Sequence, residues 1–190
     1  AKALTVSGIT ASDKTYDGST SATMDGTSAV YSGLVSGDTL TGTYSGVFDN
    51  ANVGTGKTVT ITSSYGGTDV NNYTITDQAS TTADLTKRSL VLATFSASDK
   101  VYDGDNTVTT SSSISGYVGS ETISHSLTAT FDNKNVGSSK AVTVNSVSLA
   151  DGTNGGLAAN YSLSTGQTTT ANITPKTCLL YTSPSPRDRS

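Results

Sequence analysis

Two pairs of aspartates, each ending in a Tyr-Asp-Gly triplet, are the residues that could most readily hold a metal ion. Asp13 and Asp17 form one pair, and Asp99 and Asp103 form the other. Calcium prefers several carboxylate and carbonyl oxygens held close together, and two aspartates per segment are few. A tight turn is the simpler interpretation, because Gly tolerates positive φ and Asp accepts hydrogen bonds from nearby amides. We therefore predict a structural turn motif, with calcium as the alternative, at Tyr16, Asp17, Gly18, Tyr102, Asp103 and Gly104.

The remaining reactive side chains form no catalytic pattern. Glu121 is the only Glu, with Asp38 at the matching position of the other repeat, and no carboxylate pair for hydrolysis is singled out. His125 is the only His, which suits an exposed strand residue better than a metal set or a triad. The lysines lie beside turns and not in an apolar core, which disfavours spontaneous Lys–Asn cross-links. We predict no catalytic, cofactor-binding or metal-binding residues, no cofactor and no enzymatic activity.

The surroundings of these triplets show that the chain contains two copies of one repeat. Residues 11–18 and 97–104 are identical at seven of eight positions, 86 residues apart. Residues 48–54 match 131–137, and Asn72-Tyr73 matches Asn160-Tyr161. The changes in spacing between these matches are of the kind that surface loops tolerate. We expect one repeat at 1–87, a second at 88–175 and the start of a third at 176–177, with a longer natural chain in both directions.

Apolar residues alternate with polar ones between Gly, Asn and Asp clusters, which is typical of half-buried strands. No window has helical spacing. We predict an all-β fold of two tandem small domains, an immunoglobulin-like sandwich or a β-grasp-like sheet, in an elongated arrangement. The core candidates of the first repeat are Leu4, Val6, Ile9, Tyr16, Leu34, Leu40, Phe48, Val59, Ile61, Tyr73 and Ile75.

The charge of the chain also limits its partners. The net charge is −4 and the lysines are scattered singly, which disfavours nucleic-acid binding. No stretch is long and apolar enough for a membrane helix, so we expect no membrane insertion in this fragment.

The last residues depart from the repeat. Residues 178–190 hold the only Cys and two of the three Pro, and residues 178–188 resemble a translated sequencing adapter at all eleven positions. We expect residues 178–190 to be an adapter-derived artefact without ordered structure, and exclude them from the fold.

The segments Lys2-Ala3-Leu4-Thr5-Val6, Ala11 to Gly18 and Asn52-Val53-Gly54 resemble the YDG-type repeats, related to MBG domains, of filamentous haemagglutinin-like bacterial adhesins. The resemblance covers residues 2 to 177. The second copy departs from it at Val101 and at Lys87-Arg88. The resemblance implies an all-β module in long tandem arrays, exported to the cell surface or medium of a bacterium, with no catalytic residues to carry over.

We expect a structural stalk or spacer that projects an adhesive tip, with neighbouring repeats of the same chain as its partners. The short junction Thr86-Lys87-Arg88-Ser89 favours this role, because a junction without a Gly/Ser linker is stiff. The alternative is that the loops themselves bind host or cell-surface glycans or proteins, through Tyr31, Tyr44, Tyr65 and Tyr117. In a surface enzyme that contained these modules, the activity would lie outside them.

Overall fold

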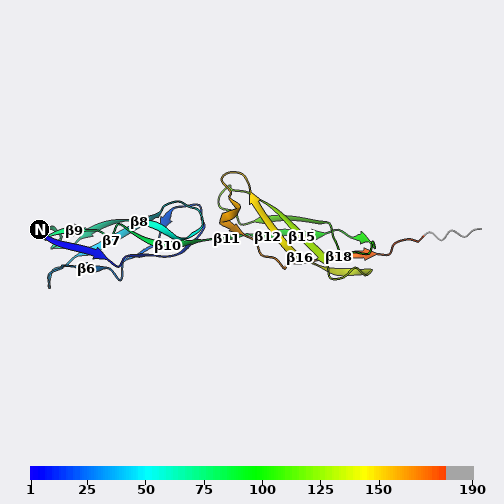
Figure 1. The fold of residues 1–190 in the computed structure, drawn as a ribbon, viewed down its shortest axis with the longest axis horizontal. Helices are drawn as coiled ribbons and strands as arrows, with labels where there is room; N and C mark the ends of the chain where they lie inside the picture. The colour runs from blue at the N-terminus through cyan, green and yellow to red at the C-terminus, as the bar shows by residue number, and fades with distance from the viewer. Residues whose placement is uncertain (179–190) are drawn as a thin grey trace, which may run out of the picture. The chain divides into compact units, whose positions relative to one another are not determined.

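The computed structural model of the chain describes residues 1–178, and within them it shows strands, turns and no α-helix. The expected all-β fold of two tandem β domains is therefore confirmed. The chain forms two compact units (Figure 1). The first unit comprises residues 1–90, 116–124 and 149–163, so it holds the whole first repeat and two loop regions of the second. The other unit comprises residues 91–115, 125–148 and the residues from Ser164 onward.

The first repeat consists of two sheets. One has three strands in the order β6-β1-β9, and the other has five in the order β3-β10-β8-β7-β4. A short pair, β2 and β5, and one 3-10 turn, η1, complete it. The elements are β1 (Lys2–Ser7), β2 (Thr10–Ala11), β3 (Lys14–Thr15), β4 (Ser21–Ala22), β5 (Met24–Asp25), β6 (Val30–Ser32), β7 (Thr41–Phe48), β8 (Gly54–Gly66), η1 (Val70–Asn72), β9 (Tyr73–Thr76) and β10 (Ser80–Thr86).

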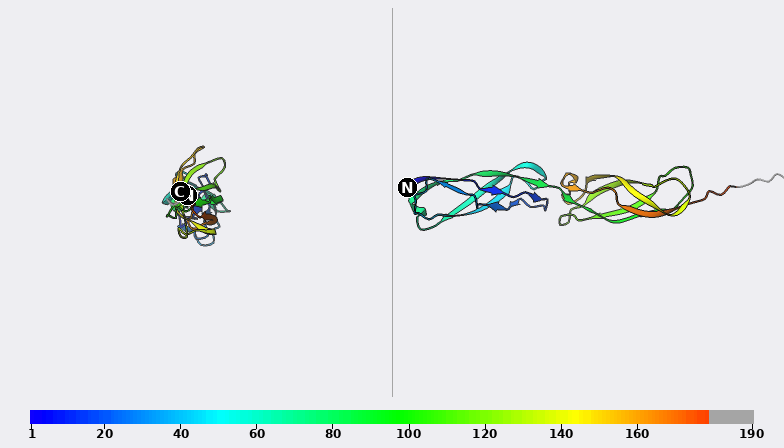
Figure 2. Two further views of the ribbon diagram at one scale, coloured as in Figure 1. Left: turned by 90° about the vertical axis from the view of Figure 1, so that its right-hand side faces the viewer. Right: turned by 90° about the horizontal axis from the view of Figure 1, so that it is seen from below.

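The pairing within these sheets is mixed. Strand β1 pairs antiparallel with β6 and parallel with β9, and the longest ladder joins β7 to β8 in antiparallel register from Thr41↔Gly66 to Phe48↔Val59. In the right-hand view of Figure 2, the strands of this repeat, coloured blue to green, run along one another. Because two sheets enclose the core and residues 1–178 contain no α-helix, the sandwich is the better of the two expected architectures.

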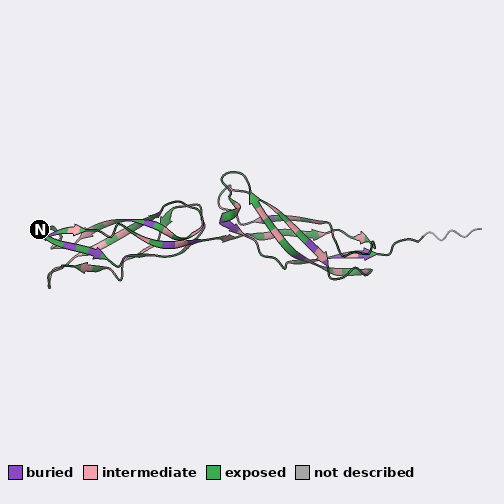
Figure 3. Cartoon of the chain, viewed as in Figure 1, coloured by how far each residue is buried: buried purple, intermediate pink, exposed green. Residues whose placement is uncertain are grey.

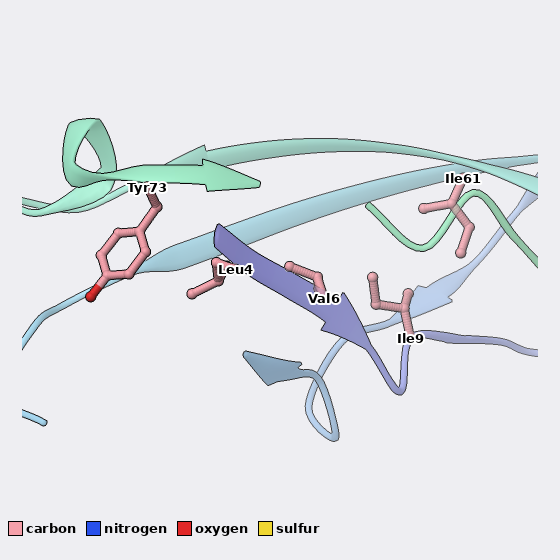
Figure 4. Close-up of a cluster of buried hydrophobic side chains, with 5 residues drawn as sticks. All are labelled: Leu4, Val6, Ile9, Ile61 and Tyr73. Atoms are coloured by element: carbon pink, nitrogen blue, oxygen red, sulfur yellow. The ribbon is translucent and has the colours of Figure 1, made fainter. Parts of the chain in front are cut away.

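Alternation of side chains fills this sandwich. Val59 and Ile61 of β8 are buried while Thr58, Thr60 and Thr62 are exposed, as the period of two requires. The colours of buried, half-buried and exposed residues change along the strands in the same way (Figure 3). Leu4 and Val6 of β1 pack with Ile9, Ile61 and Tyr73 into one cluster (Figure 4). A second cluster contains Phe48, Val59, Ala83 and Leu85.

The core prediction is largely confirmed. The candidates Leu4, Val6, Ile9, Tyr16, Phe48, Val59, Ile61 and Tyr73 are buried. Leu34, Leu40 and Ile75 are half-buried against the first cluster. Leu85, which the alternation did not single out, is 2% exposed. It lies on β10 and packs with Phe48, Val59 and Ala83 in the second cluster.

The second repeat has strands equivalent to those of the first. Some short ones lie in the first unit, and most of the others lie in the second unit. They are β11 (Arg88–Ser89), β12 (Val91–Ala97), β13 (Lys100–Val101), β14 (Thr110–Ser115), β15 (Ile123–Phe131), β16 (Gly137–Asp151), the 3-10 turn η2 (Ala158–Asn160), β17 (Tyr161–Ser162) and β18 (Thr168–Thr174). Strands β12 and β14 pair, and a four-stranded sheet has the order β13-β18-β16-β15. The core of the second unit contains Ala129, Phe131, Val142, Ala171 and Ile173.

The chain passes between the repeats without a loop. Strand β10 ends at Thr86 and β11 begins at Arg88, so only Lys87 separates them. Tyr16 N donates to Thr86 O at 2.9 Å, and Leu90 N donates to Ser162 O at 2.7 Å. Backbone hydrogen bonds therefore hold both sides of Lys87.

One expectation concerns the end of the chain, residues 178–190. Cys178 is exposed, and it forms no disulfide within the described residues. The expected artefact otherwise falls on residues 179–190, which lie outside the described residues.

Candidate functional site: a tyrosine–glutamate cluster in the first unit

The predicted turn residues lie in tight turns after short strands. Gly18 has φ +78° and Gly104 has φ +96°, which is the left-handed region that favours glycine. Asp17 Oδ1 accepts a hydrogen bond from Ser19 N at 2.8 Å. Asp103 Oδ1 accepts one from Asp105 N at 3.2 Å. In each case the carboxylate folds back on the backbone two residues later, as an Asx-turn does.

A lysine lies beside each of these turns, and its ammonium group pairs with the aspartate in place of a metal ion. Lys14 Nζ lies 2.8 Å from Asp17 Oδ1, and Lys100 Nζ lies 2.7 Å from both Asp103 Oδ1 and Asp105 Oδ1. Lys100 and Thr107 lower the pKa of Asp105 to about 2. Within residues 1–178, no three His, Cys, Asp or Glu side chains form a group that could hold a metal ion.

The other aspartates of the calcium alternative serve the sheet instead. Asp13 Oδ1 accepts a hydrogen bond from Asp84 N at 2.8 Å, and Asp99 Oδ1 accepts one from Asn172 N at 2.7 Å. Their lone pairs are therefore used to tie a turn to the last strand of each repeat. The other two aspartates, Asp17 and Asp103, are paired with lysines. Together these contacts favour the turn interpretation over a calcium site.

A second lysine clamp recurs in both repeats. Lys57 Nζ contacts Asp49 Oδ1 and Asn50 Oδ1 at 2.8 Å each. Lys140 Nζ contacts Asp132 at 2.9 Å and Asn133 at 2.7 Å. A Lys–Asn cross-link needs an uncharged amine in an apolar site, whereas each ammonium here is paired with a half-exposed aspartate. The contacts are therefore those of an ionic loop clamp.

These clamps predict a loss of stability in acid. Lys57 and Lys140 lower the pKa values of Asp49 and Asp132, and Lys100 lowers that of Asp103. A carboxyl group whose pKa is lower in the folded state stabilises the protein above its unfolded pKa of about 4, and this contribution is lost as the pH falls through the folded value. We expect the melting temperature, followed by circular dichroism, to fall between about pH 4 and pH 2.

A matched variant tests the source of that loss. Lys100→Met removes the partner of Asp103 and Asp105, so the decrease between pH 4 and pH 2 should be smaller than in the parent chain. An unchanged decrease in the Lys100→Met variant would assign the acid sensitivity to other groups.

Three of the four tyrosines expected to meet a glycan are engaged with one another, and the fourth, Tyr117, packs against Tyr161. The hydroxyls of Tyr31 and Tyr44 lie 2.8 Å apart, and the rings of Tyr44 and Tyr65 meet edge to face at 6.4 Å. Burial raises the pKa of Tyr65 to about 12 and also raises that of Tyr44. A shallow depression of about 270 Å³ lies beside Tyr44 and the strand residues around it.

His125 differs from its expected place. It lies on strand β15 as expected, but it is half-buried, and its Nε2 lies 2.9 Å from Ser112 Oγ. The prediction of an exposed side chain is therefore wrong, because the alternation of β15 turns residue 125 toward the same face as the buried Ile123.

The most unusual group of side chains in the first unit surrounds Glu121. Tyr16 donates its hydroxyl hydrogen to Glu121 Oε1 at 2.8 Å, and Tyr161 donates to Glu121 Oε2 at 2.7 Å. Tyr161 Oη also accepts from Val118 N at 3.0 Å. The rings of Tyr16 and Tyr161 meet edge to face with centroids 5.4 Å apart, and Tyr117 meets Tyr161 at 6.4 Å. We call Tyr16, Tyr117, Glu121 and Tyr161 the Glu121 cluster.

Burial makes the Glu121 cluster a strong contact. Tyr16 is 4% exposed and Tyr161 is 1% exposed. Burial, followed by the hydrogen bond to Glu121, raises the pKa of Tyr161 to about 12 and also raises that of Tyr16. Both hydroxyls are therefore protonated donors at neutral pH, and together they satisfy both oxygens of one carboxylate.

An asparagine completes the contact beside the Glu121 cluster. Asn160 at the end of η2 is 1% exposed and is a buried polar residue of the core. Its Oδ1 accepts from Val53 N at 2.9 Å, and its Nδ2 donates to Asn52 Oδ1 at 3.1 Å. Segments from both repeats therefore meet here through paired polar groups, within the first unit. The sequence pattern singled out neither Glu121 nor Asn160 for this role.

Alanine substitutions at two matched glycines, Gly18 and Gly104, test this contact. A Cβ placed on Gly18 would lie 2.9 Å from Val118 Cγ1, whereas one placed on Gly104 would meet nothing within 4 Å. Alanine at either position adopts positive φ at a cost of about 1–2 kcal/mol. We expect Gly18→Ala to lower the free energy of unfolding, measured in urea by circular dichroism, by more than Gly104→Ala does. Equal losses would mean that Gly18 is under no constraint beyond its turn.

Comparison with known families now identifies the repeats. The YDG domain matches residues 1–83 and again residues 86–171. Comparisons with curated proteins and with solved structures gave no match. No helix within residues 1–178 is long and apolar enough to cross a membrane. The two matches together cover most of the chain, which therefore belongs to the YDG domain family and contains two of its repeats.

Proposed function

We propose that the two YDG repeats are a structural spacer in a larger bacterial surface or secreted protein, in which they hold a binding domain away from the cell. The observation that carries this proposal is the junction: one residue, Lys87, separates β10 from β11, and backbone hydrogen bonds hold both sides of it. A junction of this kind resists bending, whereas a Gly/Ser linker behaves as a flexible coil.

The Glu121 cluster supports the same role. A spacer needs repeats that do not swing freely, and the two tyrosine hydroxyls on one carboxylate restrict the segments they join. The matched residues of the two repeats are core, turn and clamp residues, whose contacts maintain a fold. Stability that is shared between neighbouring repeats is the property expected of an array.

Small-angle scattering on the full chain tests the spacer. A compact globule of this length would have a radius of gyration of about 16 Å. We expect a clearly larger value. We also expect that a variant with six Gly/Ser residues inserted after Lys87 scatters as a more flexible molecule. A radius near that of the globule, or no effect of the insertion, would contradict the proposal.

The location is tested separately. Export to the surface predicts that protease added to intact cells of the source bacterium cleaves the protein, while a cytoplasmic marker stays whole. Protection of both proteins until the cells are lysed would contradict a surface location.

A further inference from the structure

The first repeat carries the groups of the Glu121 cluster a second time, at the corresponding loops. Val35 N donates to Tyr73 Oη at 2.9 Å, and Tyr73 donates to Asp38 Oδ2 at 2.6 Å. This is the arrangement of Val118, Tyr161 and Glu121, one repeat earlier in the sequence. Figure 4 shows the Tyr73 hydroxyl on the side of the ring that points away from Leu4, Val6, Ile9 and Ile61.

Within residues 1–178, no second tyrosine bonds the acid of the first repeat. Glu121 Oε1 accepts the hydrogen bond of Tyr16, whereas Asp38 Oδ1 accepts no hydrogen bond from another side chain within residues 1–178. Asn72, the equivalent of Asn160, is exposed, while Asn160 is 1% exposed. The surface of Val35, Asp38, Asn72 and Tyr73, here called the acceptor surface, is therefore a polar contact that is half complete.

The missing half is present in the second repeat. Tyr102 and Val136 are the equivalents of Tyr16 and Val53, and both are more exposed: Tyr102 is half-buried and Val136 is 48% exposed. A Cβ on Gly104 would meet nothing, whereas one on Gly18 would meet Val118. The surface of Tyr102, Gly104, Asn135 and Val136, here called the donor surface, thus has the residues that would complete the contact.

From this complementarity we propose that the acceptor surface binds the donor surface of a second copy of this chain. Tyr102 of one copy donates its hydroxyl hydrogen to Asp38 Oδ1 of the other. Asn72 meets the Asn135 side chain and the Val136 amide, as Asn160 meets Asn52 Oδ1 and Val53 N. Such a contact is heterologous, because it joins two different surfaces, and it leaves one of each surface free for the next copy.

One difference between the two acceptor groups limits the strength of the contact. Asp38 is one methylene shorter than Glu121, so the incoming tyrosine must approach more closely to reach it. Asp38→Glu restores the length, and we expect it to bind the donor surface more tightly than the natural Asp38. Asp38→Asn removes the charge without a change of size, and we expect it to bind more weakly.

The experiment uses full-length chains, each of which has only one working surface, so that only one-to-one complexes form. A 15N-labelled Tyr102→Phe chain, with its acceptor surface intact, is titrated to about 1 mM with an unlabelled Asp38→Asn chain, a concentration that suits weak contacts. We expect amide shifts at Val35, Asp38, Asn72 and Tyr73 that grow and begin to saturate. The labelled spectrum itself shows that the variant is folded.

The controls separate this contact from general association. An unlabelled partner with both changes, Asp38→Asn and Tyr102→Phe, should cause much smaller shifts. A labelled chain that carries Asp38→Glu with Tyr102→Phe should reach half-saturation at several-fold lower partner concentration. Shifts no larger than those of the double variant, or no gain from Asp38→Glu, would overturn the proposal.

This inference rests on the proposed function in one respect. It assumes that the contact between the first and second repeats can form again between two chains. The two can fail separately. Scattering measures one chain and its junction at Lys87, whereas the titration measures contact between chains. A stiff single chain without amide shifts would leave the spacer in place and remove the docking.

Discussion

Replacement of Tyr161 by alanine is expected to lower the free energy of unfolding of the first unit by about 3–5 kcal/mol, the range for removing a buried aromatic ring. Tyr161 is 1% exposed and lies between the rings of Tyr16 and Tyr117. Its loss leaves a cavity, and it also leaves Glu121 Oε2 and Val118 N without their partner. Urea denaturation followed by circular dichroism measures the change.

Tyr161→Phe separates the hydroxyl from the ring. The phenylalanine keeps the packing but removes the donor to Glu121, and an unsatisfied partner of this kind costs about 1–3 kcal/mol. We expect a loss clearly smaller than that of the alanine variant. Equal losses in the two variants would mean that the ring contributes nothing at this site, which its burial contradicts.

The pH dependence gives a second check on the same hydroxyl. The pKa of Tyr161 is raised to about 12 by burial and by Glu121. A group with a raised pKa stabilises the folded state below its unfolded pKa of about 10, and the contribution is lost as the pH rises through the folded value. The advantage of the parent chain over Tyr161→Phe should therefore shrink between about pH 10 and pH 12.

The sequence was sufficient to predict the strands, the repeat and most of the core, because these depend on local alternation and on self-similarity. Val59 and Ile61 are buried on β8 for the reason that the pattern states: their neighbours on either side are polar. Tyr16 was expected as a core residue and is buried, but the residues that bury it, Glu121 and Tyr161, are more than 100 residues away in the chain.

The Glu121 cluster could not be predicted for that reason. The sequence contained one signal, the acid shared by positions 38 and 121, but an acid beside a turn has many ordinary explanations. Only the fold shows that Tyr73 and Tyr161 point their hydroxyls at these two acids. Likewise, the prediction that His125 is exposed was wrong. The register of a strand, and not the type of residue, decides which face a side chain occupies.

Asn160→Ala is the second change for which we expect a large effect, and the repeat supplies its control. Asn160 accepts from Val53 N and donates to Asn52 Oδ1 at a site that is 1% exposed. Its removal leaves a backbone amide without a partner, at a cost of about 1–3 kcal/mol. Asn72 occupies the matching place in the first repeat and is exposed, so Asn72→Ala should change the free energy of unfolding by less than about 0.5 kcal/mol.

The comparison of these two asparagines isolates the polar contact between the two repeats. Each is the last residue of a 3-10 turn and precedes a tyrosine that bonds an acid, so their local surroundings are alike. What differs is the contact with Asn52 and Val53. A large loss for Asn160→Ala and a small one for Asn72→Ala would therefore measure that contact. Similar losses for both would mean that the asparagine serves its own turn, and that the polar pairing beside the Glu121 cluster adds little stability.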